Sequence, residues 1–468
     1  MKVSSRFITR HFIFLLTSFF VALMFFFTVF TQAAIIVVFP DPNLEAKIRE
    51  AIGKPTGDIY NTDLVGTGFI SLNASSSSIS NLTGLEFCTD LQVLYLGNNN
   101  ISNISQLSSL TKLTMLTLND NSIVNVILLS SLVNLEYLEM SYNNISNINS
   151  LSPLVNLNTF RFSGNSISDI SVLIHMPNLV DLYFDDDNVS NISVLQHLPD
   201  LEYLSMGNNP ITDISVLSYL TNLKMFWFPN SSIGDFSVLS GLNHLEMVYL
   251  VDCNISNISF LSGKSTITFL NLLNNHITNI SSLSALTNLT YLDISYNSIS
   301  NINVISGMTQ LQSLFISGNP ISSISVLSPL VNLKNFYSNG NSIGDISVLS
   351  GMNNLIQLSL YNTSIYNIDV LGGKSTIEYL WLGYNSLSNV TALKTCTGLT
   401  HVYINNNHIL DLQPLVENAS LATGDYIDVR SNPLEWDVYV SEIPALIARG
   451  VTVDYNTRTA VENWEVFE

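Results

Sequence analysis

Residues 91–112 have the sequence LQVLYLGNNNISNISQLSSLTK, and residues 289–310 have the sequence LTYLDISYNSISNINVISGMTQ. Both stretches place leucine or isoleucine at positions 1, 4, 6, 11, 14 and 17, and both place asparagine at position 9. The same 22-residue pattern runs from Phe69 to Gly398, fifteen times without an insertion or deletion. A fixed period of this length predicts a solenoid, in which each unit buries its apolar face only against its neighbours.

Each 22-residue coil begins with a strand pattern and continues as turns. Apolar residues alternate with other residues over positions 3 to 7, which predicts a short strand with positions 4 and 6 pointing inward. The stack should curve, because parallel strands crowd one side and wider turns occupy the other. The predicted fold is an α/β-type solenoid with a concave parallel sheet and a convex side of short 3-10 or irregular turns. Coils starting at Leu399 and Gly424 extend the array, so we expect about 17 coils over residues 69–434.

Two polar positions recur inside the coil. Position 9 is asparagine in 12 of the 17 coils, and its buried amide can bond backbone groups of neighbouring coils where the chain turns. Position 13 is asparagine or aspartate in most coils, as at Asn103, Asp213 and Asp345, and can cap the turn that leads to position 17. At both positions we therefore predict side chains that form hydrogen bonds with backbone N–H and C=O groups.

Residues 35–68 are predicted to form a helical N-terminal cap, because an open first coil would expose its apolar interior and its strand edge. Asp41 is the expected N-cap of a helix with Pro42 in its first turn and Gly53 after its end. A second short helix is expected near Asp63.

Residues 435–468 are predicted to form the C-terminal cap and a short acidic tail. We expect a helix over residues 436–449 and a strand over residues 451–455 within this cap. Such a helix and strand would close the far end of the stack.

Residues 1–34 differ from the rest of the chain. Lys2, Arg6 and Arg10 precede an apolar run over residues 12–30, and small residues at Thr31 and Ala33 follow it. This pattern is typical of a secretory signal peptide, although 19 apolar residues are also enough to span a bilayer as an N-terminal anchor. With either interpretation the repeats are exported, so we expect a secreted or cell-surface protein.

The charge of the chain limits the kinds of partner. The net charge is -20, and so acidic a surface repels phosphate backbones. We therefore expect no nucleic-acid partner, and contact with a membrane only through an N-terminal segment that is not cleaved. We also expect the chain to be a monomer.

The three cysteines lie in different coils. Cys88 and Cys396 are 308 residues apart, which separates them by roughly 65 Å along a stack with strands about 4.8 Å apart. No disulfide spans such a distance, so we predict that Cys88, Cys253 and Cys396 are buried thiols.

Motifs that could carry chemistry are weak. Gly263-Lys264-Ser265-Thr266 resembles the end of a phosphate-binding loop, but Ile258 stands where such a loop requires glycine. His175 and His197 share position 19 of adjacent coils and could approach each other, yet no third metal ligand recurs. We name no catalytic residue, cofactor or metal, and we expect that the protein is not an enzyme.

Acidic residues cluster where one strand ends. Asp185, Asp186 and Asp187 occupy positions 7 to 9 of a coil, and Asp181 lies on the same face. Clustered carboxylates suit a calcium ion, but they also form ordinary solvated acidic edges. We expect a solvated edge and keep calcium as the alternative.

Aromatic and large apolar residues recur at the outward positions 3 and 5 of the strands. Contiguous exposed apolar area suggests an interface, and tyrosine and tryptophan dominate binding hot spots. The alternative is that aromatic residues favour strands and pack against one another. The residues predicted to bind a partner are Tyr183, Tyr203, Met225, Trp227, Met247, Tyr249, Phe269, Tyr291, Phe315, Tyr337, Tyr379 and Trp381. At position 7, Val251 and Leu273 are expected to extend this surface.

The recurring residues resemble the leucine-rich repeat family, whose pattern is L-x-x-L-x-L-x-x-N-x-I/L, and the 22-residue period resembles the bacterial internalin-type repeat. The resemblance covers residues 69–434. It implies recognition of a protein on the concave face and no catalysis. We therefore expect an exported binding protein that recognises a protein partner through its aromatic concave face. The alternative is a glycan-binding or structural module of the cell envelope.

Overall fold

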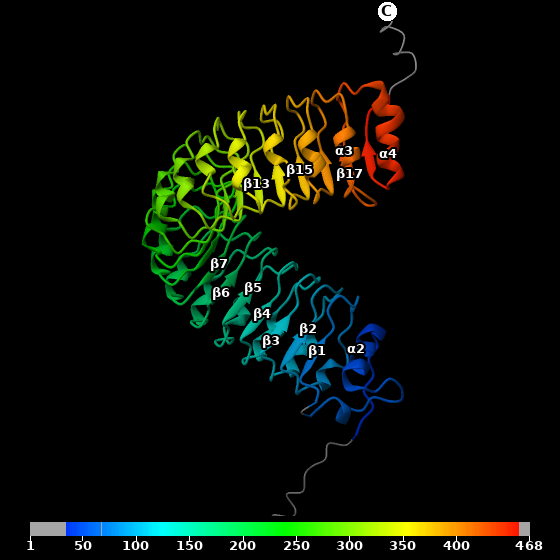
Figure 1. Ribbon diagram of the computed structural model, residues 1–468. Helices are drawn as coiled ribbons and strands as arrows, with labels where there is room; N and C mark the ends of the chain where they lie inside the picture. Colours follow the sequence, from blue (N-terminus) through cyan, green and yellow to red (C-terminus); the bar gives the residue numbers. More distant parts are fainter. Residues whose placement is uncertain (1–33, 67, 458–468) are drawn as a thin grey trace, which may run out of the picture.

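The computed structural model describes residues 34–66 and 68–457. The chain forms a horseshoe with one continuous parallel sheet along its inner side (Figure 1). Each strand pairs in parallel with the strands of the coils before and after it, and residues 22 apart face each other in 15 of the 17 strand pairs, as Leu94 faces Leu116. The predicted α/β-type solenoid is confirmed.

The strands of the sheet are only three residues long. They are β1 (Ser71–Asn73), β2 (Val93–Tyr95), β3 (Met115–Thr117), β4 (Tyr137–Glu139), β5 (Thr159–Arg161), β6 (Asp181–Tyr183), β7 (Tyr203–Ser205), β8 (Met225–Trp227), β9 (Met247–Tyr249), β10 (Phe269–Asn271), β11 (Tyr291–Asp293), β12 (Ser313–Phe315), β13 (Asn335–Tyr337), β14 (Gln357–Ser359), β15 (Tyr379–Trp381), β16 (His401–Tyr403), β17 (Tyr426–Asp428) and β18 (Thr452–Asp454).

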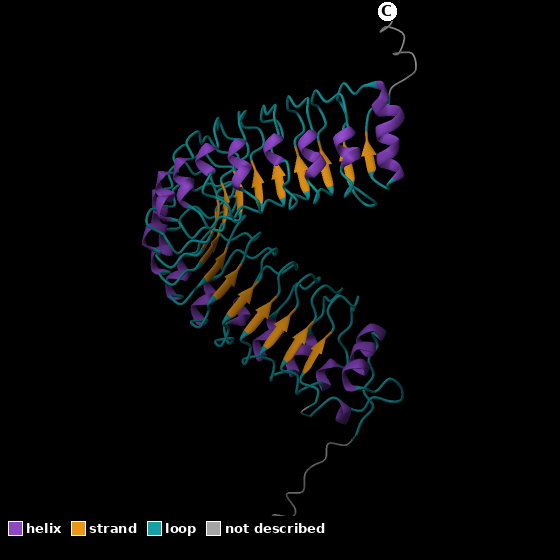
Figure 2. Cartoon of the chain, in the orientation of Figure 1, coloured by secondary structure: helices purple, strands orange, loops and turns teal. Residues whose placement is uncertain are grey.

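Short 3-10 turns cover the convex side, where Figure 2 shows them outside the strands. They are η2 (Leu85–Phe87), η3 (Ser105–Ser109), η4 (Ile127–Ser131), η5 (Asn149–Leu151), η6 (Ser171–His175), η7 (Ser193–His197), η8 (Ser215–Tyr219), η9 (Ser237–Gly241), η10 (Ser259–Leu261), η11 (Ser281–Ala285), η12 (Asn303–Gly307), η13 (Ser325–Leu327), η14 (Ser347–Gly351), η15 (Asp369–Leu371) and η16 (Thr391–Thr395). One coil has the α-helix α3 (Gln413–Glu417) in this place. The remaining 3-10 turn, η1 (Asn61–Asp63), precedes the first coil and is the second short helix expected near Asp63.

The core lies between sheet and turns, and positions 4 and 6 point into it as predicted. Leu94 and Leu96 are completely buried, for example. The predicted strand over positions 3 to 7 is too long, because position 8 turns the chain. Asn98 and Asp186 at this position have left-handed backbone conformations, with φ of 56° in each. A strand cannot continue through such a residue.

The asparagine at position 9 joins each coil to the preceding one. The side chain of Asn143 donates from Nδ2 to the carbonyl oxygens of Leu118, at 3.0 Å, and Met140, at 3.1 Å. Its Oδ1 accepts the N–H of Ile123 at 2.9 Å. Leu118 and Ile123 belong to the preceding coil, so one buried amide satisfies backbone groups of two coils.

The position-13 side chains also bond the backbone as predicted. Asn103 accepts the N–H of Ser105 at 3.0 Å, and Asp213 accepts the N–H of Ser215 at 2.9 Å. This backbone hydrogen bond lowers the pKa of Asp213. Each of these contacts holds the first residue of a 3-10 turn.

The helical N-terminal cap is present. The helix α2 (Pro42–Ile52) has Asp41 as its N-cap, which accepts the N–H groups of Asn43 and Leu44, and Gly53 follows its end with a φ of 65°. Asp41 also accepts the N–H of Ser80 at 2.8 Å. The cap is thereby fastened to the first coil of the stack.

The C-terminal cap contains a helix and a strand, but the helix is not uniform. A π-helical turn, η17 (Val438–Glu442), precedes the α-helix α4 (Ile443–Ala448). Pro444 explains the widened turn, since proline has no N–H for the hydrogen bond of a regular α-helix. The expected uninterrupted helix over residues 436–449 is therefore wrong in detail.

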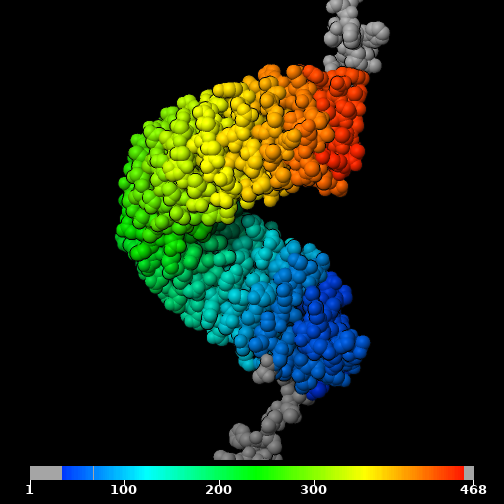
Figure 3. Space-filling model, in the orientation of Figure 1, coloured from blue at the N-terminus to red at the C-terminus, as the bar shows by residue number. Residues whose placement is uncertain are grey.

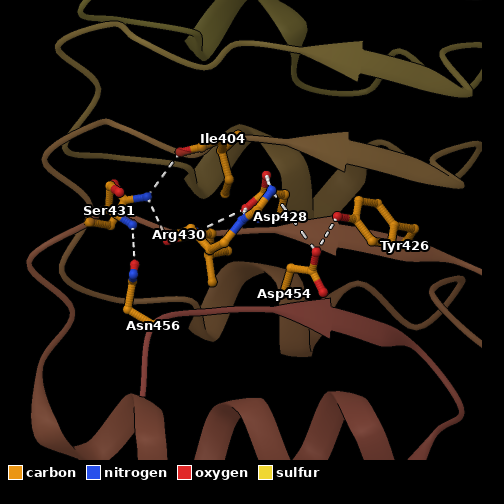
Figure 4. Close-up of polar contacts among 9 residues, drawn as sticks. Ile404, Tyr426, Asp428, Arg430, Ser431, Asp454 and Asn456 are labelled. Carbon is orange, nitrogen blue, oxygen red and sulfur yellow. Dashed lines mark hydrogen bonds and ion pairs between the residues drawn. The ribbon is translucent and has the colours of Figure 1, made fainter. Parts of the chain in front are cut away.

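Polar contacts attach the last strand to the stack (Figure 4). The Tyr426 hydroxyl donates to Asp454 Oδ2 at 2.6 Å, and Arg430 donates to both carboxylate oxygens of Asp428, at 2.9 and 2.7 Å. The N–H of Ser431 donates to the Asn456 side chain. The Tyr426–Asp454 bond and the ion pair of Arg430 with Asp454 at 4.0 Å join β18 to the preceding coil beyond the backbone pairing.

The three cysteines are free and buried, as predicted. No helix within residues 34–66 and 68–457 has the length and apolarity needed to cross a membrane. The signal or anchor expected at residues 1–34 lies outside the described residues except for Ala34, and most of the acidic tail lies outside them too. The proposed division of the chain at residues 34, 68 and 434 stays a prediction.

Asp187 replaces the position-9 asparagine in one coil. Its Oδ1 accepts the N–H of Ile167 at 2.9 Å, as an asparagine would, but its Oδ2 is buried without a hydrogen-bond partner. In the next coil, Asn209 uses its Nδ2 to donate to the carbonyl oxygen of Phe184 at 2.7 Å. Burial raises the pKa of Asp187 to about 7, and the charges of Asp185 and Asp186 contribute to the rise.

The variant Asp187→Asn should stabilise the fold, and the gain should increase with pH. Because its pKa is raised, Asp187 binds its proton more tightly in the folded chain than in the unfolded chain. The carboxyl therefore does not lower the free energy of unfolding below about pH 4, where both states are protonated, and lowers it increasingly as the pH rises to about 7. One pKa unit corresponds to about 1.4 kcal/mol, so we expect a gain of a few kcal/mol at pH 8. Thermal denaturation of both proteins at pH 5 and pH 8 measures it.

Asp186→Asn is the matched control, because Asp186 is the exposed neighbour of Asp187 and the substitution removes the same charge. It should change the melting temperature little at either pH. A gain from Asp187→Asn that is equal at both pH values, or equal to that of the control, would contradict the assignment.

Candidate functional site

The outward positions 3 and 5 of the strands form the inner surface of the horseshoe, which we call the concave face. Figure 3 shows the gap that separates the two arms of the horseshoe toward their ends. All twelve residues predicted to bind a partner lie on the concave face, within β6 to β15. Met247 is 37% exposed and the other eleven are half-buried. Val251 is 7% exposed, so its predicted contribution is wrong, whereas Leu273 at the same position of the next coil is half-buried.

Ring stacking organises the middle of the concave face. Trp227 and Tyr249 stack with centroids 3.5 Å apart and planes 4° apart. Phe269 and Tyr291 stack at 4.3 Å, and Tyr291 contacts Phe315 at 5.3 Å. Strands spaced about 4.8 Å apart place equivalent side chains at this separation.

The ring contacts continue to the C-terminal end of the sheet. Phe315 contacts Tyr337 at 5.0 Å, Tyr337 contacts Trp381 at 5.8 Å, and Trp381 stacks on Tyr403 at 5.8 Å. The contact from Tyr337 to Trp381 passes over the coil of Ser359, whose small side chain leaves room for it. The connected rings are called the aromatic ladder below; they are Phe269, Tyr291, Phe315, Tyr337, Trp381, Tyr403 and Tyr426.

The remaining predicted residues lie beside the ladder. Tyr379 stacks on His401 at 4.7 Å and contacts Trp381. Tyr183 lies in an earlier coil, and its hydroxyl is 3.7 Å from the sulfur of Met225. The structure thus divides the twelve residues into a C-terminal group joined by ring contacts and an N-terminal group around Tyr183.

Burial raises the pKa of several tyrosines on this face. Burial raises the pKa of Tyr291 to about 12, with a contribution from the charge of Asp293, and burial also raises the pKa of Tyr249. Neutral phenols act as hydrogen-bond donors and acceptors. The face therefore offers apolar rings with polar tips.

A hollow of about 530 Å³ lies on the N-terminal half of the concave face. It spans six coils and is lined from positions 5, 7 and 8, with Tyr137 added from position 3. We call it the Arg161 hollow. Its lining includes the aromatic side chains Tyr137, Tyr142, Tyr183 and Trp227, the carboxylates Asp120, Glu139, Asp185 and Asp186, and Arg161.

Arg161 is the only arginine or lysine at positions 3 and 5 of the seventeen coils. Its guanidinium forms two hydrogen bonds with Asp181, at 2.9 and 2.6 Å, and lies 4.4 Å from the ring centroid of Tyr183. The ring of Tyr137 is 5.9 Å away on another side. The sequence does not predict this hollow, because its lining comes from six coils and the residues of one repeat unit do not reveal such a grouping.

The acidic cluster does not form the expected solvated edge. Asp181 pairs with Arg161. Asp185 is half-buried and accepts hydrogen bonds from the Ser205 hydroxyl at 2.6 Å and the N–H of Gly207 at 2.7 Å. Asp187 is buried, so of the three consecutive aspartates only Asp186 is exposed. No group of three or more metal-ligating side chains occurs among residues 34–66 and 68–457, and calcium receives no support.

His175 and His197 are exposed at the ends of η6 and η7. They lie on the convex side, away from the concave face. Nothing in their surroundings assigns them a role.

The Gly-Lys-Ser-Thr segments have a structural explanation. Lys264 is 3% exposed and its Nζ donates to the carbonyl oxygens of Ser240, at 3.2 Å, and Leu242, at 2.6 Å. Lys374 repeats this arrangement with Ser350 and Met352. Burial lowers the pKa of both lysines. Their ammonium groups cap backbone carbonyls of the preceding coil and do not face a phosphate site.

The double variant Lys264→Met/Lys374→Met should stay folded and melt no lower than the wild type. Leucine or methionine occupies this position in most coils, and replacing a buried charge by an apolar side chain of similar size is often neutral or stabilising. Thermal denaturation followed by circular dichroism tests this, with the exposed Lys334→Met as control. A melting temperature several degrees below that of the control would mean that the ammonium groups are needed to hold adjacent coils together.

Comparison with protein families agrees with the geometry. A model of the leucine rich repeat matches residues 265–321, and a model of two leucine rich repeats matches residues 177–219. A comparison with curated proteins found no match. With its single parallel sheet, 22-residue coils and position-9 asparagines, the chain is a leucine-rich repeat protein.

Solved structures define the type of repeat. The crystal structure of an internalin (inlF) from Listeria monocytogenes is 29% identical over 77% of this chain and 100% of that chain, with a TM-score of 0.58. The functional domain of InlJ from Listeria monocytogenes is 24% identical over 84% of this chain and 81% of that chain, with a TM-score of 0.59. The repeats of this chain are therefore of the internalin type.

A plant receptor shares the fold at lower identity. The ectodomain of the Arabidopsis receptor kinase HAESA, in complex with an N-terminally extended IDA peptide hormone, is 20% identical. The match covers 82% of this chain and 70% of that chain, with a TM-score of 0.64. At this identity the comparison supports the fold alone.

Proposed function

We propose that the chain is an exported binding protein that recognises a protein partner through its concave face. The observation that carries the proposal is the row of half-exposed rings along that face, from Trp227 through the aromatic ladder. Rings held at fixed spacing lose little conformational freedom on binding, and tyrosine and tryptophan are enriched at binding hot spots. The twelve predicted residues are the proposed contact surface.

The solved structures support a protein or peptide partner. The HAESA ectodomain carries a peptide hormone, and it has the same curved stack of repeats. A curved sheet presents a long surface on which an extended or folded partner can lie. We propose that the chain acts by binding and not by catalysis.

Export is part of the proposal. The basic residues, apolar run and small residues within residues 1–34 support a signal or anchor. Mass spectrometry of the mature N-terminus decides between them: a first peptide starting at Ala34 means release, and an intact segment over residues 12–30 means anchoring.

Glycan binding is the second candidate, since sugars stack on aromatic faces. The geometry favours it less. Trp227 and Tyr249 cover one face of each other at 3.5 Å, and Phe269 and Tyr291 do so at 4.3 Å. Rings stacked in this way expose their edges more than their faces, whereas a sugar platform needs an open face.

The triple variant Trp227→Ala/Tyr249→Ala/Phe269→Ala should lose most partner binding and keep its fold. These rings lie on the surface of the sheet, so their loss removes contact area without opening the core. Affinity capture of host and envelope proteins, quantified by mass spectrometry, measures binding; far-UV circular dichroism measures the fold. We expect at least a tenfold loss of each specific partner.

The matched control is Tyr219→Ala/Tyr366→Ala/Ile127→Ala, whose side chains are 58%, 65% and 55% exposed outside the concave face. It should capture partners as the wild type does. Undiminished capture by the concave triple variant would refute the proposal. Binding of the wild type to isolated polysaccharides on a glycan array, with no protein captured, would favour the second candidate.

A further inference from the structure

The Arg161 hollow has an excess of negative charge that the chain itself does not compensate. Four carboxylates line it, and the single guanidinium within it, that of Arg161, is already paired with Asp181. Glu139 accepts the N–H of Ser141 through Oε1 at 2.9 Å. The Ser141 hydroxyl also bonds Glu139, and the charge of Arg161 acts on this carboxylate, whereas the exposed carboxylate of Asp186 has no hydrogen bond within the described residues. Asp186 therefore remains available to a ligand, and Glu139 keeps further acceptor sites.

Aromatic walls accompany these carboxylates. Tyr142 is 57% exposed and lines the hollow from position 8, where its backbone has a φ of 55°. Its ring also covers Gly164 of the next coil, where an added Cβ would lie 2.5 Å from the tyrosine Cδ1. Trp227 lines the other end of the hollow. The faces of aromatic rings attract cations, most strongly where water is partly excluded.

The chain already contains one example of the recognition that these walls permit. The guanidinium of Arg161 lies over the ring of Tyr183 and forms two parallel hydrogen bonds with a carboxylate. Arginine suits such a place better than lysine, because its planar group stacks on rings and forms paired bonds with carboxylates. Glu139, Asp186 and Tyr142, which lie within three successive coils of the hollow, offer a second place of the same chemistry.

We propose that the Arg161 hollow binds an arginine side chain of the protein partner, beside the ring of Tyr142 and the carboxylates of Glu139 and Asp186. The inference rests on the proposed function and adds the chemistry of the partner. Trp227 belongs both to the hollow and to the stacked rings that continue along the face. The partner therefore presents an arginine followed by an apolar surface that lies toward the aromatic ladder.

The test uses the full-length chain and a short glycine-flanked peptide with two arginines. Analogues in which citrulline or lysine replaces both arginines keep the length and change only the side-chain group. Ligand-observed NMR titration at low ionic strength yields dissociation constants for such weak ligands. We expect the arginine peptide to bind about tenfold more tightly than the citrulline peptide, from stacking and paired hydrogen bonds.

The variant Glu139→Gln/Asp186→Asn should raise the dissociation constant of the arginine peptide to that of the citrulline peptide. Both changes preserve shape, and asparagine is common at position 8, as at Asn98 and Asn208. The matched control Glu378→Gln/Asp252→Asn removes equal charge outside the hollow and should leave binding unchanged.

Three results would overturn the assignment: equal binding of the arginine and citrulline peptides, equal binding of the lysine peptide, or equal losses in the two double variants. Equal losses would mean that the net charge of the whole chain attracts the peptide. All three results concern the arginine site alone. The proposed function fails only if the triple variant Trp227→Ala/Tyr249→Ala/Phe269→Ala captures its partners undiminished. If the hollow shows no preference for the arginine peptide but the triple variant loses its partners, the aromatic surface remains the proposed binding site.

Discussion

The hydrogen bonds of the position-9 side chain hold each coil to the one before it, and the rest of the structure depends on them. The left-handed residue at position 8 ends the strand after three residues, which leaves backbone groups at the turn without strand partners. A buried asparagine supplies both a donor and an acceptor there, as Asn143 does. Even where the coil that starts at Leu399 is longer than the others, Asn432 makes the same two contacts with the preceding coil.

The same carbonyl-rich interior explains which polar substitutions it tolerates. Cys253 replaces the asparagine and still directs its Sγ toward the carbonyl oxygen of Phe228 at 3.1 Å. Lys264 brings an ammonium group to two carbonyl oxygens of the preceding coil. Asp187 has no donor when ionised, and its Oδ2 remains unsatisfied. The interior thus accepts a thiol or an ammonium group as donor, but it accepts a carboxyl group only in the protonated form.

Regular stacking also creates the surface that we propose for binding. In-register pairing places position 3 over position 3 and position 5 over position 5, so aromatic residues in successive coils meet as stacked rings. Those contacts bury part of each ring and fix its orientation before a partner arrives. Toward the N-terminal end the same positions carry Glu139 and Arg161. The concave face therefore has a polar, acidic half and an aromatic half that meet at Trp227.

The 22-residue spacing by itself determined the solenoid, the inward positions and the asparagine contacts. These features could be predicted because each depends on residues within one coil or on the identical residue of the next coil. The tertiary structure alone decided the strand length, the burial of Val251 and the separation of Asp185, Asp186 and Asp187 into three different environments. It also decided that Tyr337 reaches Trp381 across a coil and that Asp120 and Trp227 line one hollow. Such contacts depend on the curvature of the stack and on the direction of each side chain over several coils, and a period in the sequence does not contain that information.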